Sequence, residues 1–475
     1  MRPRLTLSSF LFFLILPVAL VGQEFPTLAT DASAGTGEIQ PCEIRGTEVR
    51  CGTYRVWEDR TARSGRTIDL AFAVVPAEGQ TEPTRDAIVL LPGGPGQALI
   101  GAAPGMARRT HFRSRDVLLV DVRGVGRSQG LSCPDFEIDV QDRFGTVFPR
   151  QHIQMCRDAL AERASLDLYT TNLSVDDIEE LRTWLGYEAV NLTGGSYGTR
   201  VAQVYMRRHP EAIRTVVLNS VAPVFVLGYV HMAQSLQRSL DLVVTDCLSE
   251  TECSASHPEL REQLDGVLAR FARGPVEVEV NGSLVDFTMG DFAYALRGLL
   301  YGGAQAVPEI IRLASEGDFD RVSSYYLQRA GWVGGQGGEA GYHFSALCGE
   351  DILPLTDAMV EEASEGTFMG DHLIAGYREV CDVWGVTPLP DSFWEPVRSD
   401  LPVLIISGEF DPVTPPAWGD AVAEHLPNSV HVVVPGGGHG PGNACTNSLE
   451  ARLLEDASVA GLDPSCMQSS GGAGG

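Results

Sequence analysis

Short apolar runs of strand length alternate with helical patterns along most of this chain, and this rhythm restricts the possible folds more than any other feature. The runs are Ile68–Val75, Ala87–Leu91, Val117–Val122, Ala189–Leu192, Thr215–Asn219, Val403–Ser407 and Val430–Val434. Since most of these runs are apolar without alternation, both faces of each strand must be covered. A helix expected from Ser174, its N-cap, to Gly186 has its apolar residues on one face and supplies such cover. The sequence therefore predicts an α/β fold, a mostly parallel central sheet with helices on both faces.

The stretch from about 224 to 400 loses this rhythm and is rich in helical pattern. Helices are expected at Tyr229–Val244, Pro258–Arg273, Asp291–Tyr301 and Val307–Gly317. Because this stretch lies between two core strands, we expect a large, mainly helical cap inserted over the C-terminal edge of the sheet. The core would then consist of residues 41–223 and 401–468.

The N-terminus has the pattern of a secretory signal peptide. Two arginines precede an apolar run from Leu5 to Gly22, and small and polar residues follow it. We predict a signal peptide at 1–22, a flexible lead-in at 23–40 and a disordered tail at 469–475. An uncleaved anchor is the alternative reading of the apolar run. With cleavage, the protein would be exported to the periplasm or the medium and would have no stable membrane association.

Ten cysteines fit an oxidising compartment, in which disulfides persist. Pairing of neighbours along the chain is the pattern that we expect, although the sequence does not fix it. The pairs would be Cys42–Cys51, Cys133–Cys156, Cys247–Cys253, Cys348–Cys381 and Cys445–Cys466. The chain contains neither CxxC nor HExxH, so we predict no metal site and no cofactor.

The formal net charge of −27 argues against nucleic acid as a partner, because polyanion-binding proteins are basic. A solvated acidic surface is the simpler interpretation of this charge.

A G-x-S-x-G pattern from Gly194 to Gly198 lies between the strand predicted at 189–192 and a helix predicted at 199–209. A nucleophile between a strand and a helix needs a sharp turn with small neighbours, and these glycines supply them. The turn would expose the hydroxyl of Ser196 and direct the helix N-terminus at a developing oxyanion. Ser196 is therefore the candidate nucleophile.

A serine nucleophile needs a histidine base and an acid that orients it. Asp411 follows one predicted strand and His439 follows the next, so both lie at the edge where Ser196 would be. The order Ser, Asp, His is that of α/β-hydrolases. Glu409 is the rival acid, which we assign to a solvated turn, and His431 alternates with core valines. The predicted triad is Ser196, Asp411 and His439.

Acyl transfer also needs donors for the oxyanion. The glycine-rich segment Leu90–Gly96 follows a strand, and we expect the backbone N–H groups of Gly94 and Tyr197 to form the oxyanion hole. A phosphate-binding loop is excluded because no Gly-Lys-Ser/Thr follows.

Taken together, these motifs resemble the prolyl iminopeptidase and tripeptidyl aminopeptidase family of α/β-hydrolases, most closely the secreted tripeptidyl aminopeptidases. The matching segments are LPGGPG at 91–96, DVRGVGRS at 121–128, GGSYGT at 194–199 and GEFDPVTP at 408–415. The resemblance extends from about 42 to 450 and implies an α/β-hydrolase fold with Ser196, Asp411 and His439 as the triad. Within DVRGVGRS, we expect Asp121 and Arg123 to fix a turn. Pro92 departs from the pattern, because prolyl iminopeptidases carry His there.

An aminopeptidase of this kind needs a carboxylate for the free ammonium of its substrate. The segment around Cys348-Gly-Glu350-Asp351 resembles the family's segment after a cysteine. Glu350 and Asp351 are the candidate amine ligands, and plain surface acidity is the alternative.

The sequence thus predicts an exported serine aminopeptidase that acts through an acyl-enzyme on peptides with a free N-terminus. It would release tripeptides or single residues. A carboxylesterase with the same triad is the alternative enzyme, since one fold hosts both activities, and a non-catalytic binding module is the alternative outside the enzymes. The cap residues Trp332, Trp384 and Trp394 would line an ester pocket or pack within the cap.

Overall fold

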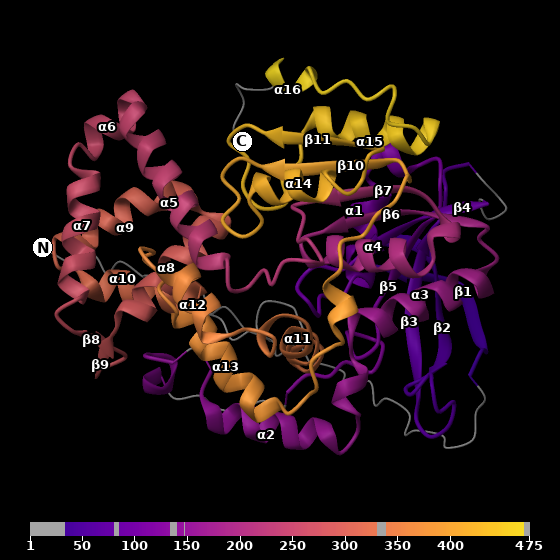
Figure 1. Cartoon of the computed structure of the whole chain (residues 1–475), viewed down its shortest axis with the longest axis horizontal. Helices are drawn as coiled ribbons and strands as arrows, with labels where there is room; N and C mark the ends of the chain where they lie inside the picture. Colours follow the sequence, from indigo (N-terminus) through magenta and orange to yellow (C-terminus); the bar gives the residue numbers. More distant parts are fainter. Residues whose placement is uncertain (1–33, 80–84, 134–139, 147, 330–338, 470–475) are drawn as a thin grey trace, which may run out of the picture. The chain divides into compact units, whose positions relative to one another are not determined.

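A nine-stranded sheet forms the core of the protein in the computed structural model, which describes residues 34–79, 85–133, 140–146, 148–329 and 339–469 (Figure 1). Its strands are β1 (Gly37–Ile44), β2 (Thr47–Trp57), β3 (Thr67–Val75), β4 (Asp86–Leu91), β5 (Val117–Val120), β6 (Ala189–Gly195), β7 (Ile213–Asn219), β10 (Val403–Gly408) and β11 (Ser429–Val434). The order across the sheet is β1-β2-β3-β5-β4-β6-β7-β10-β11. The strands from β5 to β11 run parallel, and β1, β2 and β3 add an antiparallel edge.

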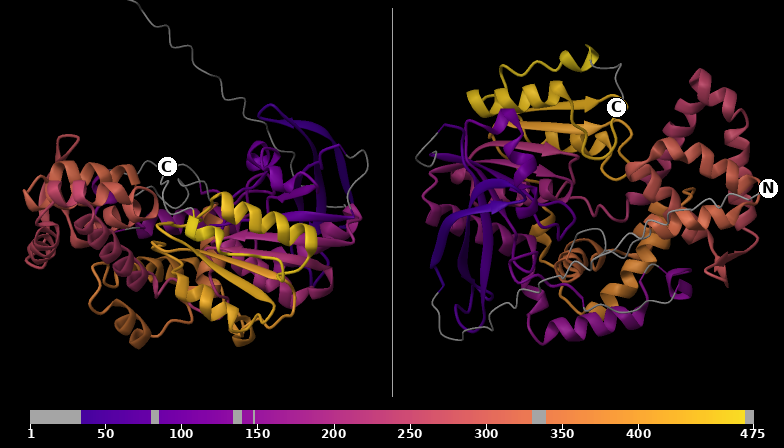
Figure 2. Two further views of the ribbon diagram at one scale, coloured as in Figure 1. Left: turned by 90° about the horizontal axis from the view of Figure 1, so that it is seen from above. Right: turned by 180° about the vertical axis from the view of Figure 1, so that it is seen from behind.

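Helices cover both faces of this sheet, as its apolar strands require (Figure 2). The helices outside the segment between β7 and β10 are α1 (Ala103–Ala107), α2 (Arg150–Ala161), α3 (Thr171–Leu185), α4 (Tyr197–Arg208), α14 (Pro416–Ala423), α15 (Ala444–Asp456) and α16 (Cys466–Ser469). Of these, α2 packs on the cap and not on the sheet. On one face, α3, α4 and α14 belong to the largest apolar core, while α1 and α15 pack into two smaller cores on the other. The predicted α/β-hydrolase architecture is confirmed.

Between β7 and β10, the chain forms a mainly helical cap. It contains α5 (Met232–Ser249), α6 (Thr251–Ser256), α7 (Leu260–Phe271), α8 (Met289–Gly302), α9 (Val307–Ser315), α10 (Phe319–Arg329), α11 (Ala340–Leu347), a π-helical turn (Cys348–Ile352), α12 (Asp357–Ser364) and α13 (His372–Trp384). The hairpin of β8 (Val276–Val280) and β9 (Ser283–Phe287), which the sequence analysis missed, also belongs to it. Cap and core share one continuous apolar cluster, so the cap is packed on the core and not separate from it.

Two predicted boundaries were wrong. The lead-in was expected to extend to residue 40, but β1 begins at Gly37 and pairs with β2. This edge strand is exposed over most of its length, so its composition is that of a loop. Helix α3 begins at Thr171, and Thr170 rather than Ser174 is its N-cap, accepting from the Leu173 amide.

The predicted signal peptide at 1–22 and residues 470–475 of the predicted tail lie outside the described residues. In the described part of the chain, no helix has both the length and the apolar character needed to cross a membrane.

Five disulfides join neighbouring cysteines along the chain, in the pattern that the sequence analysis expected. They are Cys42–Cys51, Cys133–Cys156, Cys247–Cys253, Cys348–Cys381 and Cys445–Cys466. Cys348–Cys381 ties the π-helical turn to α13, so it fixes the part of the cap that faces the sheet.

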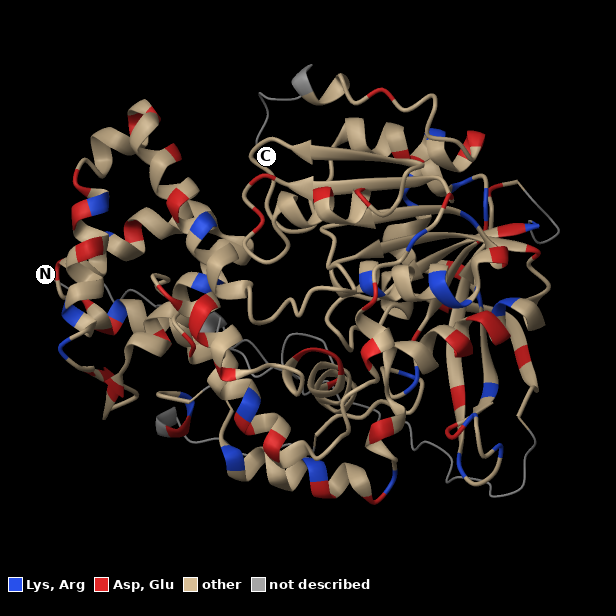
Figure 3. Ribbon diagram, viewed as in Figure 1, with Lys and Arg blue, Asp and Glu red and all other residues tan. Residues whose placement is uncertain are grey.

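The negative charge of the chain is spread over its surface. Figure 3 shows acidic residues on helices and strands of both the core and the cap. Many of the arginines form ion pairs with them, such as Arg312 with Glu309 and Arg261 with Asp241. This distribution is that of a solvated surface.

Candidate active site

The C-terminal ends of four parallel strands meet at one edge of the sheet. Strand β6 leads to Ser196, β10 to Asp411 and β11 to His439, while β4, which pairs with β6, leads to the glycine-rich segment. Ligand sites of open parallel sheets lie at this edge, because all the loops after the strands project from it. The sheet therefore brings together the motifs that are far apart in sequence.

Ser196 stands on a strained turn between β6 and α4. Its φ of 56° and ψ of −126° lie outside the regions that a serine normally adopts. Both flanking glycines are needed for this turn. A Cβ on Gly194 would lie 2.4 Å from the Gly198 carbonyl oxygen, and one on Gly198 would lie 2.5 Å from the Leu91 carbonyl oxygen. The local sequence thus holds the hydroxyl of Ser196 at the sheet edge.

Asp411 and His439 lie beside this turn, buried and within hydrogen-bond distance of each other. The Nδ1 atom of His439 lies 2.9 Å from Oδ2 and 3.0 Å from Oδ1 of Asp411. Four further groups donate to the carboxylate: the amides of Val413 and Thr414 and the hydroxyls of Thr414 and Ser220. Burial opposes ionisation, but these donors and His439 outweigh it and lower the pKa of Asp411. Asp411 is therefore an ionised acceptor that fixes the Nδ1 tautomer of His439.

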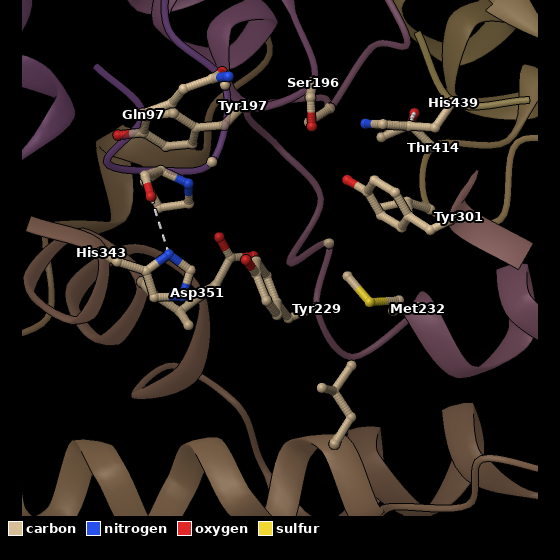
Figure 4. A pocket seen from close by; sticks show the side chains of 18 of the residues that line it. Gln97, Ser196, Tyr197, Tyr229, Met232, Tyr301, His343, Asp351, Thr414 and His439 are labelled. Carbon is tan, nitrogen blue, oxygen red and sulfur yellow. Dashed lines mark hydrogen bonds between the residues drawn. The ribbon is translucent and has the colours of Figure 1, made fainter. Parts of the chain in front are cut away.

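The other nitrogen of His439, Nε2, is buried and has no hydrogen-bond partner among the described residues. Figure 4 shows the ring directed toward Ser196, with Tyr301 from the cap below both side chains. The Tyr301 ring packs on His439 with 4.8 Å between centroids, and its hydroxyl interacts with Ser196. An unpartnered imidazole nitrogen that faces a serine hydroxyl is the arrangement that a general base requires.

The segment after β4 lies against Ser196. A Cβ on Gly93 would be 3.8 Å from the Cβ of Ser196, and Gly94 has a φ of 107°, which favours glycine. Tyr197 is the first residue of α4, so its N–H has no acceptor within the helix. Gly94 and Tyr197 both line the cavity beside Ser196.

His343 from α11 holds this segment in place. Its Nδ1 atom donates to the Pro95 carbonyl, 3.0 Å away, and its Nε2 atom lies 3.4 Å from the Tyr377 hydroxyl. Burial lowers the pKa of His343 to about 4, so the ring is neutral and keeps this donor. A cap residue thus positions a core loop, which no sequence motif indicated.

The rival residues face elsewhere. Glu409 accepts from the Gly436 amide, 2.8 Å away, and His431 hydrogen-bonds Ser407 and Asp420. Asp121 accepts from the amides of Leu99, Ile100 and Arg127, and Arg123 pairs with Asp177 in the core, so both residues fix a turn.

A cavity of about 1080 Å³ lies between the sheet edge and the cap, and Ser196 and His439 line it. Cap residues form its other walls, among them Tyr229, Tyr294, Tyr301, Tyr377 and Leu373. Its volume is at the upper end of the usual range for small-molecule pockets, so it accommodates a ligand of several residues. Of the tryptophans considered above, Trp384 is packed within the cap and Trp394 donates to the Glu350 carbonyl. Trp332 lies outside the described residues.

Glu350 and Asp351 line the same cavity, and both are buried rather than exposed on the surface. Thr171 donates to both oxygens of Glu350, from its amide at 2.8 Å and its hydroxyl at 2.6 Å. Asp351 forms an ion pair with Arg200 through Oδ2, whereas its Oδ1 is buried without a hydrogen bond. The amides of Gly228 and Tyr229 are near enough to lower the pKa of Asp351, but they do not satisfy Oδ1. Of the two acids, Asp351 is therefore the one with an oxygen that accepts no hydrogen bond.

The protonation of these acids follows from their burial. Burial raises the pKa of Glu350 to about 7, although Thr171 and Arg200 oppose the shift. Burial also raises the pKa of Asp351, against the opposing effect of Arg200. The guanidinium of Arg200 is the positive charge that acts on both Glu350 and Asp351. When both acids are ionised, this cluster of three residues therefore has one negative charge without a partner.

Residues 86–441 match the family described as alpha/beta hydrolase fold, which is most of the chain. The chain belongs to the α/β-hydrolase family. Serine protease Hip1 of Mycobacterium tuberculosis is 23% identical over 448 residues, covering 83% of this chain and 83% of the relative. Tripeptidyl aminopeptidase of Streptomyces lividans is 26% identical over 191 residues, 36% of this chain and 35% of the relative. Proline iminopeptidase of Neisseria meningitidis is 25% identical over 134 residues, 28% of this chain and 32% of the relative.

These relatives are all named as peptidases, so the resemblance to aminopeptidase-type hydrolases is confirmed. As a member of this family, the chain is a serine hydrolase.

Besides His343, three residues around Ser196 and Asp411 were not anticipated from the sequence: Thr414, Ser220 and Tyr301. Thr414 is part of the GEFDPVTP segment, so its position after Asp411 was a usable signal. Ser220 and Tyr301 belong to no motif, and only the fold brings them to Asp411 and Ser196.

Proposed function

We propose that this hydrolase is an exported aminopeptidase that removes short N-terminal peptides or single residues from peptides with a free N-terminus. The observation that carries the proposal is the location of Glu350 and Asp351, two buried carboxylates in the cavity that also contains Ser196 and His439. An ester pocket has no use for uncompensated negative charge, whereas an ammonium group would neutralise it.

In the proposed reaction, the Ser196 hydroxyl attacks the scissile carbonyl carbon while His439 Nε2 takes its proton. Asp411 keeps the imidazole in the required tautomer and stabilises the imidazolium that forms. The N–H groups of Gly94 and Tyr197 stabilise the tetrahedral oxyanion. His439 then protonates the leaving amine, which departs and leaves an acyl-enzyme on Ser196. A water molecule, deprotonated by His439, releases the N-terminal fragment and restores Ser196.

Asp351 and Glu350 have different roles in amine binding. Oδ1 of Asp351 is the free acceptor, so we assign it the hydrogen bond from the substrate ammonium. Glu350 is held by Thr171 and supplies the remaining negative charge. Arg200 fixes the orientation of Asp351 from the other side. The distance from this group to Ser196 would determine how many residues are released.

This arrangement predicts a pH window for amine recognition. Glu350 ionises only as the pH rises through about 7, whereas a peptide α-amine, with a pKa of about 8, must remain protonated. The preference for a free over an acetylated N-terminus should therefore be strongest between about pH 7 and 8. Expressing this preference as a ratio of the two substrates cancels every pH effect on the chemical step that they share.

The disulfides and the N-terminal sequence support the proposed export. Disulfides persist in oxidising compartments, and the sequence places the pattern of a signal peptide before the first cysteine.

The experiment that tests the proposal compares peptides of one to three residues on a fluorogenic amine, their N-acetyl versions and short acyl esters. We expect cleavage of free N-termini, with an optimum length that separates tripeptide from single-residue release. Asp351→Asn should raise KM for free peptides by about 100-fold while esters are spared, because a charge-assisted contact is lost. Ser196→Ala controls for contaminating enzymes, and an active-site serine probe tests whether the Asp351 variant is folded. Turnover of esters with none of the peptides would contradict the proposal and identify a carboxylesterase.

A further inference from the structure

Arg297 brings a positive charge to the cavity from helix α8. It lines the cavity together with Tyr294 and Tyr301, which precede and follow it by about one helical turn. Its guanidinium carbon lies 5.9 Å from the ring centroid of Tyr294 and 5.8 Å from that of Tyr301. Tyr301 in turn packs on His439, so Arg297 is near the triad.

No carboxylate of the described residues pairs with Arg297, and its Nε atom is buried without a hydrogen bond. The hydroxyl of Tyr294 is also buried without a partner. This is unusual in a chain with a net charge of −27, where other cap arginines such as Arg261 and Arg378 pair with acids. A buried donor without a partner costs free energy, and the cost is recovered if a ligand supplies the acceptor.

The cavity thus has uncompensated charge of both signs. Glu350 and Asp351 share Arg200 and leave one negative charge, whereas Arg297 has no acid at all. Asp351 pairs with Arg200, whereas no acid of the described residues pairs with Arg297, so different residues hold the negative and the positive charge. A ligand that carries an ammonium and a carboxylate matches this distribution.

We propose that Arg297, assisted by the Tyr294 hydroxyl, binds a carboxylate of the peptide substrate. This inference rests on the proposed function, because it assumes that the ligand is a peptide. The carboxylate comes either from the C-terminus of a short peptide or from an Asp or Glu side chain. In both cases, the enzyme selects peptides that are charged at two points, and Arg297 determines this specificity without taking part in the chemistry.

The test compares four versions of one tetrapeptide: neutral with a C-terminal amide, neutral with a free C-terminus, and each with Glu in place of Gln. Arg297→Gln should raise KM for the carboxylate-bearing peptides by about 10-fold or more and leave the neutral amide within about 2-fold, because a charge-assisted hydrogen bond is lost. If KM rises only for peptides with a free C-terminus, the carboxylate that Arg297 binds is the C-terminal one. If KM rises only for the Glu peptides, it is a side-chain carboxylate. Arg297→Lys should restore part of the affinity, since it keeps the charge without the planar fork.

Arg143 provides a matched comparison, because it lines the same cavity but is exposed. Arg143→Gln measures the effect of removing a positive charge from the cavity in general. An equal loss in the Arg143 and Arg297 variants would overturn the proposal, as would an equal loss of all four peptides in Arg297→Gln. The latter result would mean that Arg297 only packs on the tyrosines.

A second readout separates this proposal from the proposed function. The same peptides are used as inhibitors of the hydrolysis of a neutral acetate ester, which reports binding whether or not they are cleaved. Stronger inhibition by the carboxylate forms in the native protein, lost in Arg297→Gln, supports the Arg297 site even if no peptide is cleaved. Inhibition that is independent of the carboxylate contradicts it even if the aminopeptidase activity is found.

Discussion

The sheet edge and the cap wall contribute to one cavity but hold their polar groups in different ways. At the sheet edge, Asp411 is saturated by donors and its pKa is lowered, so its charge is fixed. In the cap, burial raises the pKa of Glu350 to about 7, and Asp351 and Arg297 have atoms without partners. At the sheet edge the acid is fully paired and the unpartnered Nε2 atom of His439 faces Ser196, whereas in the cap charged groups have atoms without partners. From this difference, we propose that the first region performs the reaction and the second recognises the substrate.

The largest expected effect comes from the sheet edge. Ser196→Ala should reduce kcat by at least about four orders of magnitude on peptides and esters alike, because the nucleophile serves every substrate. Steady-state kinetics on both substrate types measures it. The comparison would fail if ester hydrolysis survived, since the chemistry would then reside elsewhere in the cavity.

A second test weakens the cap alone. The Cys348–Cys381 disulfide closes a loop with a sequence separation of 33 residues, and its removal by a double Ser substitution should lower the free energy of unfolding by about 3 to 4 kcal/mol. Urea denaturation measures this loss. Discrimination between free and acetylated peptides should decline before ester hydrolysis does. Removal of the pair Cys247–Cys253, which closes a loop with a separation of only 6, is the matched control and should cost less.

The raised pKa of Glu350 makes a third test possible. The folded protein binds the Glu350 proton more tightly than the unfolded chain, so this contribution to stability is present below about pH 4.5 and lost as the pH rises through about 7. Glu350→Gln has no carboxyl group to titrate, so it does not lose this stability as the pH rises. Its free energy of unfolding relative to the native protein should improve by up to about 3 kcal/mol between pH 4 and pH 8. A difference that does not change with pH would mean that folding does not shift the pKa of Glu350.

The smallest effect is expected at Thr414, which donates to Asp411 through its amide and its hydroxyl. Thr414→Val removes only the hydroxyl and should reduce kcat by about 10-fold on all substrates, because one charge-assisted hydrogen bond is lost. Unchanged KM ratios between free and acetylated peptides would support separate roles for the two regions. A loss of peptide cleavage without a loss of ester hydrolysis would contradict separate roles.

The difference between the sheet edge and the cap also explains which parts of the site could be predicted from the sequence. Ser196, Asp411 and His439 each follow a strand, and parallel strands end at a common edge, so local patterns were sufficient to predict that they meet. Glu350 and Asp351 were found through the family resemblance of one short segment.

Arg297 and His343 were not found, because their roles depend on which groups the cap helices bring near them. A lone arginine on an amphipathic helix has no pattern that separates it from the arginines that pair on the surface. Strand β1 was missed for a related reason, since an exposed edge strand lacks an apolar run.

The π-helical turn that carries Glu350 and Asp351 has a consequence for how this enzyme could diversify. Such a turn contains one residue more than an α-helical turn, and it interrupts the path from α11 toward α12. Deleting the codon for Gly349, which precedes both acids, would let the helix continue regularly and rotate the residues beyond it by about 100°. Both acids would then turn away from the cavity while the triad remained intact. A peptidase and an esterase on this scaffold would thus be separated by one small deletion rather than by a new active site.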